Sequence, residues 1–424
     1  MFCTLLLAGS MLLGQTSPNA SDDLAREVSR LVRDLSAPEL AKREAAHQKL
    51  IELGPAVLEL LPTPNDRTSA EEKQRLSQIR DKLQKSQAEG TLKASVVTLQ
   101  GEMRLSEAFK AIEKQTGNLM IDYREQFGGE GGDPKVKASF DKTPFWQAVD
   151  DILDQAGLTT YAYPEKDGVA AITLPDGELP RRKRPVSYAG AFRLEALELM
   201  SRRGLRSSGD RQMQLQLEVG WEPRLDPISI QHQLTDIQAI DENGNMLELD
   251  GDEETRELPI NAGDLTAELM FPFKLPDRKV KTIASLKGKL LAMVPGRIET
   301  FRFDDLTLKN VEQRKAGVVV VLDQVRKNAD VWEVRVLVRF DKADGALESH
   351  RGWIFSNECY LETPNKERIE NDGFETTRQT GQEVGMAYLF DLEKGPKGLK
   401  LVYKTPSVVS LVPIEYELKN LELP

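Results

Sequence analysis

Two segments in the first half of the chain carry apolar residues at helical spacing, and they are the best-defined elements that the sequence predicts. The first ends at Gly117 and places on one face Leu105, Ala108, Phe109 and Ile112. The second begins at Thr143, a favoured N-cap, has Pro144 as its first helical residue and ends at Gly157. Its apolar face holds Phe145, Val149, Ile152 and Ala156, with Trp146 and Leu153 beside them. Each face requires a sheet to cover it.

Five short segments around these helices predict the strands of a single small sheet. They are Leu92 to Leu99, Leu119 to Asp122, Val136 to Phe140, Leu158 to Tyr163 and Val169 to Leu174. A glycine-rich segment, Phe127 to Gly132, connects the two halves of this region. It lacks the Lys-Ser/Thr of a phosphate-binding loop and precedes a strand instead of a helix. We therefore interpret it as a flexible connection.

The stretches LSEAFKAIEKQTG, NLMIDYR and VKASFDKTPFWQAVDDILDQAGLTTYAY resemble the secretin and TonB short N-terminal domain, a small β-α-β/β-α-β module of the bacterial envelope. The resemblance covers residues 91–174, under a fifth of the chain. It implies a protein-docking or ring-lining part that has no enzymatic activity of its own. An envelope or secretion-system protein is then the expected partner, bound through an edge strand.

Residues 22–89 predict helices. Leu24, Val28, Leu31 and Leu35 form one stripe, and a capping box over 36–39 begins a second helix that ends before Gly54. A third helix is predicted over 71–89. The segment LVRDLSAPELAKREAAHQKLIELGPAVLELL resembles a single HEAT-type repeat, which cannot bury its apolar face alone. We expect this hairpin to pack on a neighbouring domain or to serve as a docking arm.

From Tyr188 the period of the pattern changes to two, which predicts antiparallel β-sandwiches. Inward-facing positions of one strand are Met213, Leu215, Leu217 and Val219. Further strands of this sandwich are predicted over 228–240, 265–273, 282–294 and 298–303, with turns at Asn243-Gly244, Asp250-Gly251 and Pro295-Gly296. Strands of a second sandwich are predicted over 318–321, 332–340, 353–361, 383–391, 399–403 and 407–418. Its tail, FETTRQTGQEVGMAYLFDLEKGPKGLKLVYKTP, resembles bacterial immunoglobulin-like extracellular domains.

These patterns together predict an α+β multidomain protein: an N-terminal helical hairpin, a small β-α-β/β-α-β module, then two antiparallel β-sandwich domains. The predicted parts are a signal-peptide-like segment over 1–20, a helical region over 22–89, the module over 91–174, a basic linker over 175–187, and sandwiches over 188–308 and 311–424. The linker contains four adjacent cations, Arg181 to Arg184, and we expect it to be exposed. An anionic-polymer contact or a processing site is the alternative there.

Charge and length narrow the range of partners and compartments. The net charge of -11 disfavours general nucleic-acid binding, which requires clustered Lys and Arg. Phe2 to Gly14 is an uncharged apolar segment, too short to span a bilayer, that resembles the hydrophobic region of a secretory signal peptide without its basic start. We expect export to the periplasm or cell surface, with Ala20 as the cleavage point; a retained anchor and a cytoplasmic helix are the alternatives. No transmembrane span is expected after signal removal, and the oligomeric state is not predicted.

Catalytic and metal-binding patterns are weak. The three histidines, His47, His232 and His350, fall in three different predicted domains, so we predict no histidine-based metal site or catalytic triad. Cys359 lies in a predicted strand and is interpreted as a buried, inert thiol. Asp241 begins a partial calcium-loop pattern that breaks at the glycine position, so a hairpin turn is expected instead. No catalytic residue and no cofactor are predicted.

The densest polar and aromatic cluster is the candidate ligand site of the second sandwich. It consists of Glu348, His350, Arg351, Trp353, Asn357 and Glu358. Aromatic faces and charged forks suit a sugar or a peptide, whereas a buried Trp353 with an arginine-carboxylate pair is the structural alternative. The leading hypothesis is a non-catalytic interaction scaffold of the cell envelope. Carbohydrate or cell-wall binding by the second sandwich, and a hydrolase with an unrecognised carboxylate pair, are the other hypotheses.

Overall fold

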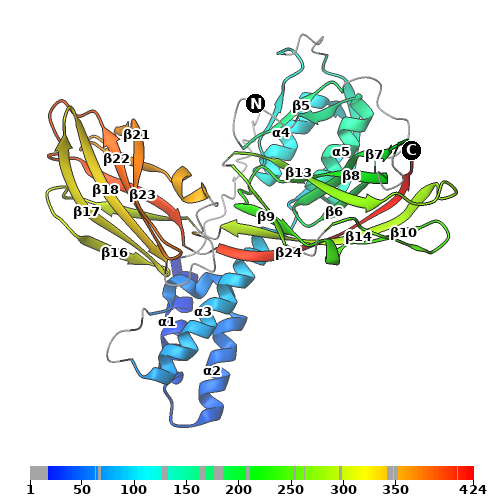
Figure 1. The fold of residues 1–424 in the computed structure, drawn as a ribbon. Coiled ribbons are helices and arrows are strands. Elements are labelled where there is room, and N and C mark those ends of the chain that lie inside the picture. Colours follow the sequence, from blue (N-terminus) through cyan, green and yellow to red (C-terminus); the bar gives the residue numbers. More distant parts are fainter. Residues whose placement is uncertain are drawn as a thin grey trace, which may run out of the picture. The chain divides into compact units, whose positions relative to one another are not determined.

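The computed structural model describes residues 18–62, 64, 68–126, 132–161, 168–175, 185–206, 211–251, 255–261, 263–295, 298–340, 347, 352–407 and 409–424. Contacts divide the chain into two compact units, residues 1–87 and 88–424, and each is described by itself. Helices dominate the first unit and strands the second (Figure 1). This confirms the predicted combination of N-terminal helices with a mostly antiparallel β region.

The first unit packs its helices around a core of its own. Its elements are α1 (Pro18–Asp34), α2 (Leu40–Glu52), the 3-10 helix η1 (Pro55–Leu60) and α3 (Ala70–Thr91), whose last residues belong to the second unit. All four contribute to one buried cluster: Val28, Leu31, Leu35, Ala46, Leu50, Val57, Leu61, Leu76, Ile79 and Leu83. The hairpin of α1 and α2 therefore packs its apolar face against η1 and α3 of the same unit.

The predicted capping box at the start of α2 is wrong. The helix begins at Leu40, and its N-cap, Glu39, makes no capping hydrogen bond through its side chain. Ser36, which the pattern places at the N-cap, donates its hydroxyl to Glu72 Oε2 of α3 at 2.7 Å instead. A contact between helices therefore replaces the local cap.

The region that resembles the short N-terminal domain has the predicted order of elements. They are β1 (Val96–Arg104), α4 (Leu105–Thr116), β2 (Met120–Asp122), β3 (Lys135–Pro144), α5 (Phe145–Ala156), β4 (Thr159–Tyr161) and β5 (Ala170–Thr173). Gly117 and Gly157 end the two helices in the left-handed conformation, as predicted. Within the glycine-rich connection, Phe127 to Gly131 lie outside the described residues.

Two predictions for this module are wrong. Its strands form two sheets instead of one: β1 pairs antiparallel with β3, while β5 pairs parallel with β2 and antiparallel with β4. Strand β3 continues to Pro144, so Pro144 and not Thr143 is the N-cap of α5. The amide of Phe145 then donates to the carbonyl of Ser95 at 2.9 Å, which satisfies a donor that the threonine was expected to cap.

The first sandwich consists of two antiparallel sheets. One has the order β13-β8-β7-β6, with bounds Thr266–Lys274, Arg211–Trp221, Phe192–Arg203 and Val186–Ala189. The other combines β9 (Ser229–His232), β10 (Gln238–Asp241), β11 (Met246–Leu247), β12 (Arg256–Pro259), β14 (Thr282–Pro295) and β24 (Val409–Glu422). The strand predicted over 228–240 is divided by the 3-10 helix η2 (Leu234–Asp236). The inward alternation predicted for β8 is confirmed.

The second sandwich also has two sheets. One has the order β15-β23-β19-β20, with bounds Ile298–Phe303, Lys400–Pro406, Cys359–Glu362 and Arg368–Glu370. The other has the order β16-β17-β18-β22-β21, with bounds Val311–Lys315, Val318–Asn328, Val331–Phe340, Glu383–Phe390 and Gly373–Gln379. A 3-10 helix, η3 (Gly352–Ser356), occupies the first four residues of the strand that was predicted over 353–361, and β19 occupies its last three.

A single two-stranded ribbon runs through both sandwiches. Strands β14 and β15 pair with β24 and β23 in the same register throughout, from Thr282 with Glu422, through Pro295 with Val409 and Ile298 with Pro406, to Phe303 with Leu401. Residues 296, 297 and 408 within it lie outside the described residues. The second sandwich is thus inserted between two strands that pair with each other in the first. This pairing differs from the predicted grouping, which placed 298–303 in the first sandwich, 407–418 in the second and a turn at Pro295-Gly296.

The module and the first sandwich share one hydrophobic core. The core includes Phe109, Phe145 and Ile152 of the module together with Leu217 and Phe271 of the sandwich. The backbones also meet directly, because the amide of Ala191 donates to the carbonyl of Leu92 at 2.8 Å. Gly190, with φ of 59°, allows this approach, since an added Cβ would lie 2.4 Å from that carbonyl oxygen. The two predicted domains therefore fold against each other.

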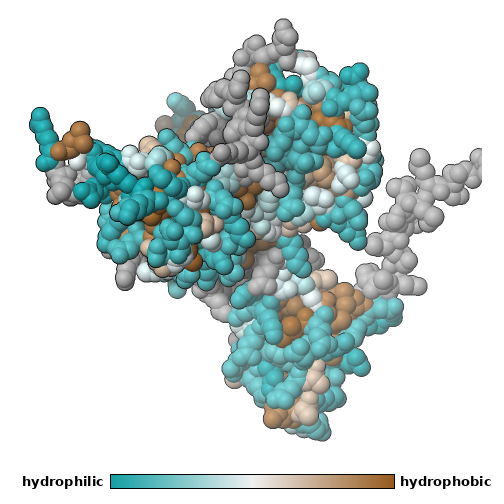
Figure 2. All heavy atoms as spheres, turned by 90° about the vertical axis from the view of Figure 1, so that its right-hand side faces the viewer, coloured by the Kyte–Doolittle hydropathy of each residue, from teal (hydrophilic) through white to brown (hydrophobic). Residues whose placement is uncertain are grey.

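Among the described helices none is long and apolar enough to cross a membrane. The face drawn in Figure 2 is mostly hydrophilic, with apolar side chains in separate patches.

The ring of Tyr416 packs on a glycine of the ribbon, Gly288, and leaves no space for a larger residue there. Gly288 lies opposite Tyr416, and an added Cβ would come 2.4 Å from the Cζ atom of this buried ring. We expect Gly288→Ala to lower the free energy of unfolding by about 1–3 kcal/mol in urea titrations, because the ring must move. Tyr416→Phe is the control and should cost little, since the hydroxyl has no hydrogen-bond partner among the described residues. Equal stability of Gly288→Ala and the parent would contradict the packing of the ring on this glycine.

Candidate functional site

The sequence-predicted ligand cluster is only partly described. Glu348, His350 and Arg351 lie outside the described residues. Trp353 is half-buried in η3, and its ring meets Phe340 edge-on with centroids 5.9 Å apart.

The polar residues beside Trp353 make contacts within the sandwich. Asn357 Nδ2 donates to Tyr403 Oη at 3.0 Å and to Thr405 Oγ1 at 2.9 Å. Glu358 accepts from Arg368 and Lys404. In this arrangement the Asn357 amide group fixes β23 and does not point to a free surface.

The candidates for nucleophilic or metal chemistry are dispersed. Cys359 is buried as predicted, and burial raises the pKa of its thiol well above the ordinary value. His232 lies buried in β9 with its ring edge against Phe271, and burial lowers its pKa. In the described parts of the chain no group of three or more His, Cys, Asp or Glu side chains could hold a metal ion. Asp241 accepts from the amides of Asn243 and Asn245, which confirms the hairpin turn.

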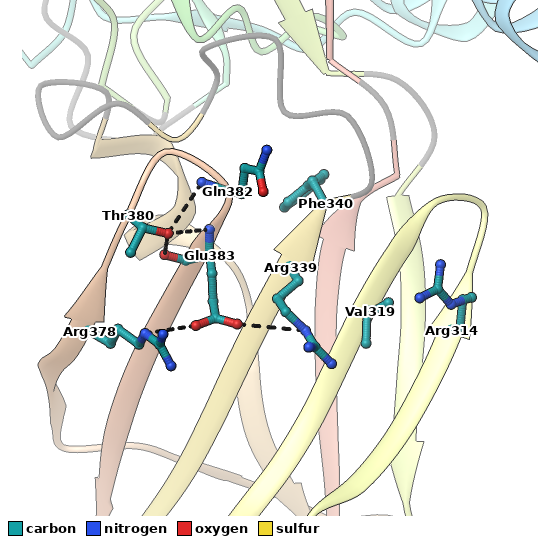
Figure 3. Close-up of a pocket in the computed structure, with 8 residues that line it drawn as sticks. All are labelled: Arg314, Val319, Arg339, Phe340, Arg378, Thr380, Gln382 and Glu383. Carbon is teal, nitrogen blue, oxygen red and sulfur yellow. Dashed lines mark hydrogen bonds and ion pairs between the residues drawn. The ribbon is translucent and has the colours of Figure 1, made fainter.

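A cavity lined by three arginines lies on the outer face of the five-stranded sheet of the second sandwich (Figure 3). Its volume is about 430 Å³, and its lining residues are Arg314, Val319, Arg339, Phe340, Arg378, Thr380, Gln382 and Glu383. We call it the arginine groove. Four of its residues form one row across four adjacent strands, because Arg314 pairs with Val319, Val319 with Arg339, and Arg339 with Glu383.

Strand alternation explains why these side chains face outward. Val318, Val320, Val338 and Val384 are fully buried in the core of the sandwich, so their neighbours along each strand point to the opposite face. Arg378 lies on the edge strand β21, next to a bulge between Thr376 and Arg378. The Thr380 hydroxyl accepts from the amides of Gln382 and Glu383 and shapes the turn that carries Glu383 into the groove (Figure 3).

The charged side chains in and beside the groove form ion pairs with one another. Glu383, whose side chain is 13% exposed, lies 2.8 Å from Arg378 Nε and 3.7 Å from Arg339 Nε. Arg339 Nη2 also donates to Glu312 Oε2 at 2.8 Å. Arg339 and Arg378 thus share the carboxylate of Glu383, and Arg339 contacts a second carboxylate. The Nε–H of Arg339 is buried and has no hydrogen-bond acceptor among the described residues.

At the other end of the same sheet face, one carboxylate is held by three donors. Glu333 accepts hydrogen bonds from Arg326, Asn328 and Arg335. The bond from Arg326 is the main cause that lowers the pKa of Glu333 to about 2.

Such an arrangement suits the binding of an anion. Planar guanidinium groups hold carboxylate or phosphate oxygens through paired hydrogen bonds, and they stay charged at all physiological pH values. Among the residues lining the groove there is no Ser, Cys or Lys beside a histidine or other general base, which a nucleophilic mechanism requires.

A second polar cluster is buried between α5 and the outer face of the first sandwich. Arg193 of β7 is 2% exposed and contacts three carboxylates: Asp150 of α5 at 2.8 Å, Glu218 of β8 at 3.3 Å, and Glu195. Tyr188 Oη donates to the same oxygen of Asp150 at 2.6 Å. Burial lowers the pKa of Arg193, but the surrounding carboxylates outweigh burial and raise it. This cluster attaches the module to the sandwich.

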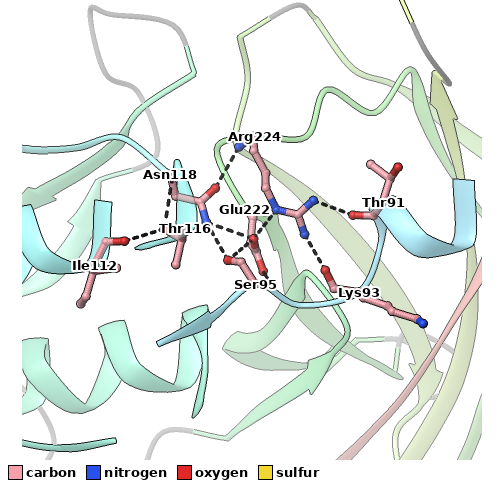
Figure 4. Close-up of polar contacts among 8 residues, drawn as sticks. All are labelled: Thr91, Lys93, Ser95, Ile112, Thr116, Asn118, Glu222 and Arg224. Carbon is pink, nitrogen blue, oxygen red and sulfur yellow. Dashed lines mark hydrogen bonds and ion pairs between the residues drawn. The ribbon is translucent and has the colours of Figure 1, made fainter. Parts of the chain in front are cut away.

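A third cluster joins the same two parts around Glu222 (Figure 4). Its carboxylate is fully buried and accepts from the amide and hydroxyl of Ser95, from Asn118 Nδ2 and from Arg224 Nε. Arg224 also donates hydrogen bonds to the backbone carbonyls of Thr91 and Lys93. Both clusters are enclosed by the chain and have their main contacts within it, so we assign them a structural role.

The sequence analysis found none of the residues of the arginine groove. The alternation of valine with charged residues over 332–340 did indicate that Arg339 faces outward. What the pattern lacks is the register between strands, which brings Arg314 and Glu383 into the row of Arg339. Comparison of the chain with protein-family models, with curated proteins and with solved structures finds no match.

Proposed function

We propose that this is a non-catalytic binding protein whose second sandwich holds an anionic ligand in the arginine groove. The observation that carries the proposal is the convergence of guanidinium groups: Arg339 and Arg378 share Glu383 at a cavity of about 430 Å³ that Arg314 also lines.

The composition of the chain makes this site distinctive. The chain carries a net charge of -11, yet three arginines converge on one cavity. A positively charged cavity on an acidic protein attracts anions locally, while the remaining surface repels strongly charged polymers such as nucleic acids. The proposal therefore concerns a ligand with few, separated negative charges.

The sequence adds the proposed compartment. The apolar segment over 2–14 and the resemblance over 91–174 support an exported protein of the bacterial envelope that serves as an interaction scaffold. Fractionation of a tagged copy tests this part, and a tag found only in the cytoplasm would contradict it. Deletion of 91–174 is unsuitable as a test of docking, because it would expose the core that the module shares with the first sandwich.

Removal of one groove arginine tests the binding site. We expect Arg378→Ala to weaken binding of a fluorescein-labelled peptide, with two glutamates separated by alanines, about tenfold or more at about 0.15 M salt, since a hydrogen bond to a charged group contributes about 1.5–3 kcal/mol. Fluorescence anisotropy with the full chain measures the affinity. Arg378 is 63% exposed, so the variant should remain folded.

Arg302→Ala is the matched control for this experiment. Arg302 lies on β15, in the other sheet of the same sandwich, and it also pairs with one carboxylate, Glu362 at 3.1 Å. Its removal changes the net charge by the same amount and should leave the affinity within about twofold, because long-range charge effects on exposed sites are screened. Equal losses in the two variants, or no binding by the parent, would refute the groove.

A further inference from the structure

We propose that Gln115 and Gln155 close the two edges of the β1–β3 strand pair in the module, and that they thereby prevent a second copy of the chain from pairing there. The arginine groove plays no part in this proposal. It is carried by two sets of hydrogen bonds that occupy equivalent places in the two halves of the module, and by the charges along the edge of β3.

The β1–β3 pair has two edges that no other described strand covers. One face of the pair is buried through Val136, Ala138 and Phe140, whereas Gln100 of β1 and Ser139 of β3 are exposed. An exposed strand edge offers unpaired N–H and C=O groups and is therefore a template for pairing with another chain. Stable proteins usually cover, interrupt or charge such edges.

A glutamine side chain occupies one residue of each edge. Gln115 Oε1 accepts from the amide of Thr98 at 2.9 Å, and its Nε2 donates to the carbonyl of Thr98 at 3.1 Å. Gln155 makes the same two contacts with Lys137, where Oε1 accepts at 2.8 Å and Nε2 donates at 3.0 Å. A side-chain amide has the donor and the acceptor of a peptide group, so each glutamine takes the position of a residue in an added strand.

The two glutamines lie at equivalent positions in the module. Each is the second-last residue of its helix, α4 or α5, two residues before the glycine that ends it. Each closes the strand that precedes its helix, β1 or β3. Both side chains are exposed, so the packing of the module does not require them. The feature that they share is the contact with a strand edge.

The edge of β3 offers several residues for pairing once Gln155 is removed. In an antiparallel pair the backbone groups of every second residue point away from the partner strand. Because those of Lys137 point to Gln155, those of Ser139 and Asp141 lie along the same edge. A strand that adds to all three residues must therefore displace the glutamine.

The charges on this edge favour a second copy of the chain as the added strand. If two copies of β3 pair antiparallel about a two-fold axis at Ser139, Lys137 of each copy lies opposite Asp141 of the other. Opposite charges at directly opposed positions stabilise strand pairing. The edge is thus complementary to itself, and Gln155 is the group that occupies it.

Replacement of Gln155 by alanine tests the proposal with the full chain. We expect Gln155→Ala to show, in sedimentation velocity, a rise with concentration to about twice the mass of the parent, since two copies pair about one two-fold axis. The amide of Lys137 should also exchange with deuterium faster in dilute samples, because alanine supplies no acceptor. Gln147→Ala is the matched control. Gln147 is exposed on the same helix, and its removal should change neither the mass nor the exchange.

Two further variants identify the edges that pair. Lys137→Glu in the Gln155→Ala background should return the mass to that of the parent, because two carboxylates would then face each other across the axis. The double variant with Gln115→Ala and Gln155→Ala should form assemblies larger than a dimer, since each copy then has two open edges. Circular dichroism establishes whether each variant is folded.

The proposal is refuted if Gln155→Ala keeps the mass of the parent at every concentration, whatever the exchange of Lys137. A dimer that persists with Lys137→Glu also refutes it, because the copies would then pair elsewhere. Loss of folded structure in Gln155→Ala would show that the glutamine serves the fold itself, and a double variant that stops at the dimer would refute the role of Gln115. A dimer that forms in Gln155→Ala but not in Gln147→Ala, and that Lys137→Glu reverses, supports the proposal.

Discussion

Replacement of Arg193 by leucine is expected to lower the free energy of unfolding of the 88–424 unit by about 3–5 kcal/mol near neutral pH. The guanidinium is 2% exposed and is the shared partner of Asp150, Glu195 and Glu218. Without it, three carboxylates remain together at a buried junction and repel one another. Urea unfolding followed by circular dichroism measures the loss.

The loss should depend on pH in a defined direction. Burial raises the pKa of Glu218 above its ordinary 4.5, although Arg193 opposes the rise. A raised folded-state pKa means that the folded protein binds this proton more tightly than the unfolded chain, so its stabilising effect is complete below 4.5 and is lost as pH rises through the folded pKa. Removal of Arg193 raises that pKa further. The variant should therefore lose more stability between about pH 5 and pH 8 than the parent does.

A double variant and a surface control complete this test. Glu218→Gln in the Arg193→Leu background should restore part of the stability near pH 8 and flatten the pH dependence, since one buried charge is gone. Arg302→Leu, on the surface of the second sandwich, should change the unfolding free energy by less than about 1 kcal/mol. A loss in Arg193→Leu that is the same at all pH values would show that packing, and not charge, determines the effect.

Glu222→Leu is the second substitution with a large expected effect, again about 3–5 kcal/mol of unfolding free energy. The carboxylate is the common acceptor for Ser95, Asn118 and Arg224, and leucine leaves their donors unsatisfied in a fully buried position. Glu222→Gln should lose less, because its amide oxygen still accepts hydrogen bonds.

Glu268→Leu is the matched control for Glu222. Glu268 lies on β13 of the same sandwich, is exposed and accepts one hydrogen bond, from Gln216 at 2.6 Å. We expect its removal to cost less than about 1 kcal/mol. Similar losses for Glu222→Leu and Glu268→Leu would contradict the role of the buried cluster in joining the module to the sandwich.

Local patterns predicted the elements of this protein well. Two glycine-stopped helices, the alternation of β8 and the strand over 298–303 follow from rules that act over a few residues, and the structure confirms them. The predicted capping box at Ser36 is wrong although its pattern is equally local. The Ser36 hydroxyl donates its hydrogen bond to Glu72 of another helix instead. Tertiary contacts can override a local preference of about 1 kcal/mol.

Strand partners were not predictable from one sequence. The alternation over 282–294 and over 407–418 identifies both strands, but nothing in it states that they pair with each other across the intervening sandwich. The same applies to the site: Arg314, Arg339 and Arg378 look like ordinary exposed residues until register places them beside one cavity. Pairing over long sequence distances depends on the whole fold.

The ribbon of β14, β15, β23 and β24 has a mechanical consequence. Because the chain enters and leaves the inserted sandwich at paired positions, Pro295 and Val409, a force applied to that sandwich reaches the first one through both strands of the ribbon at once. Both strands are then loaded in the same direction, and the tension does not peel one away from the other. The connection alone therefore makes the junction between the two sandwiches more resistant to unfolding under such a force.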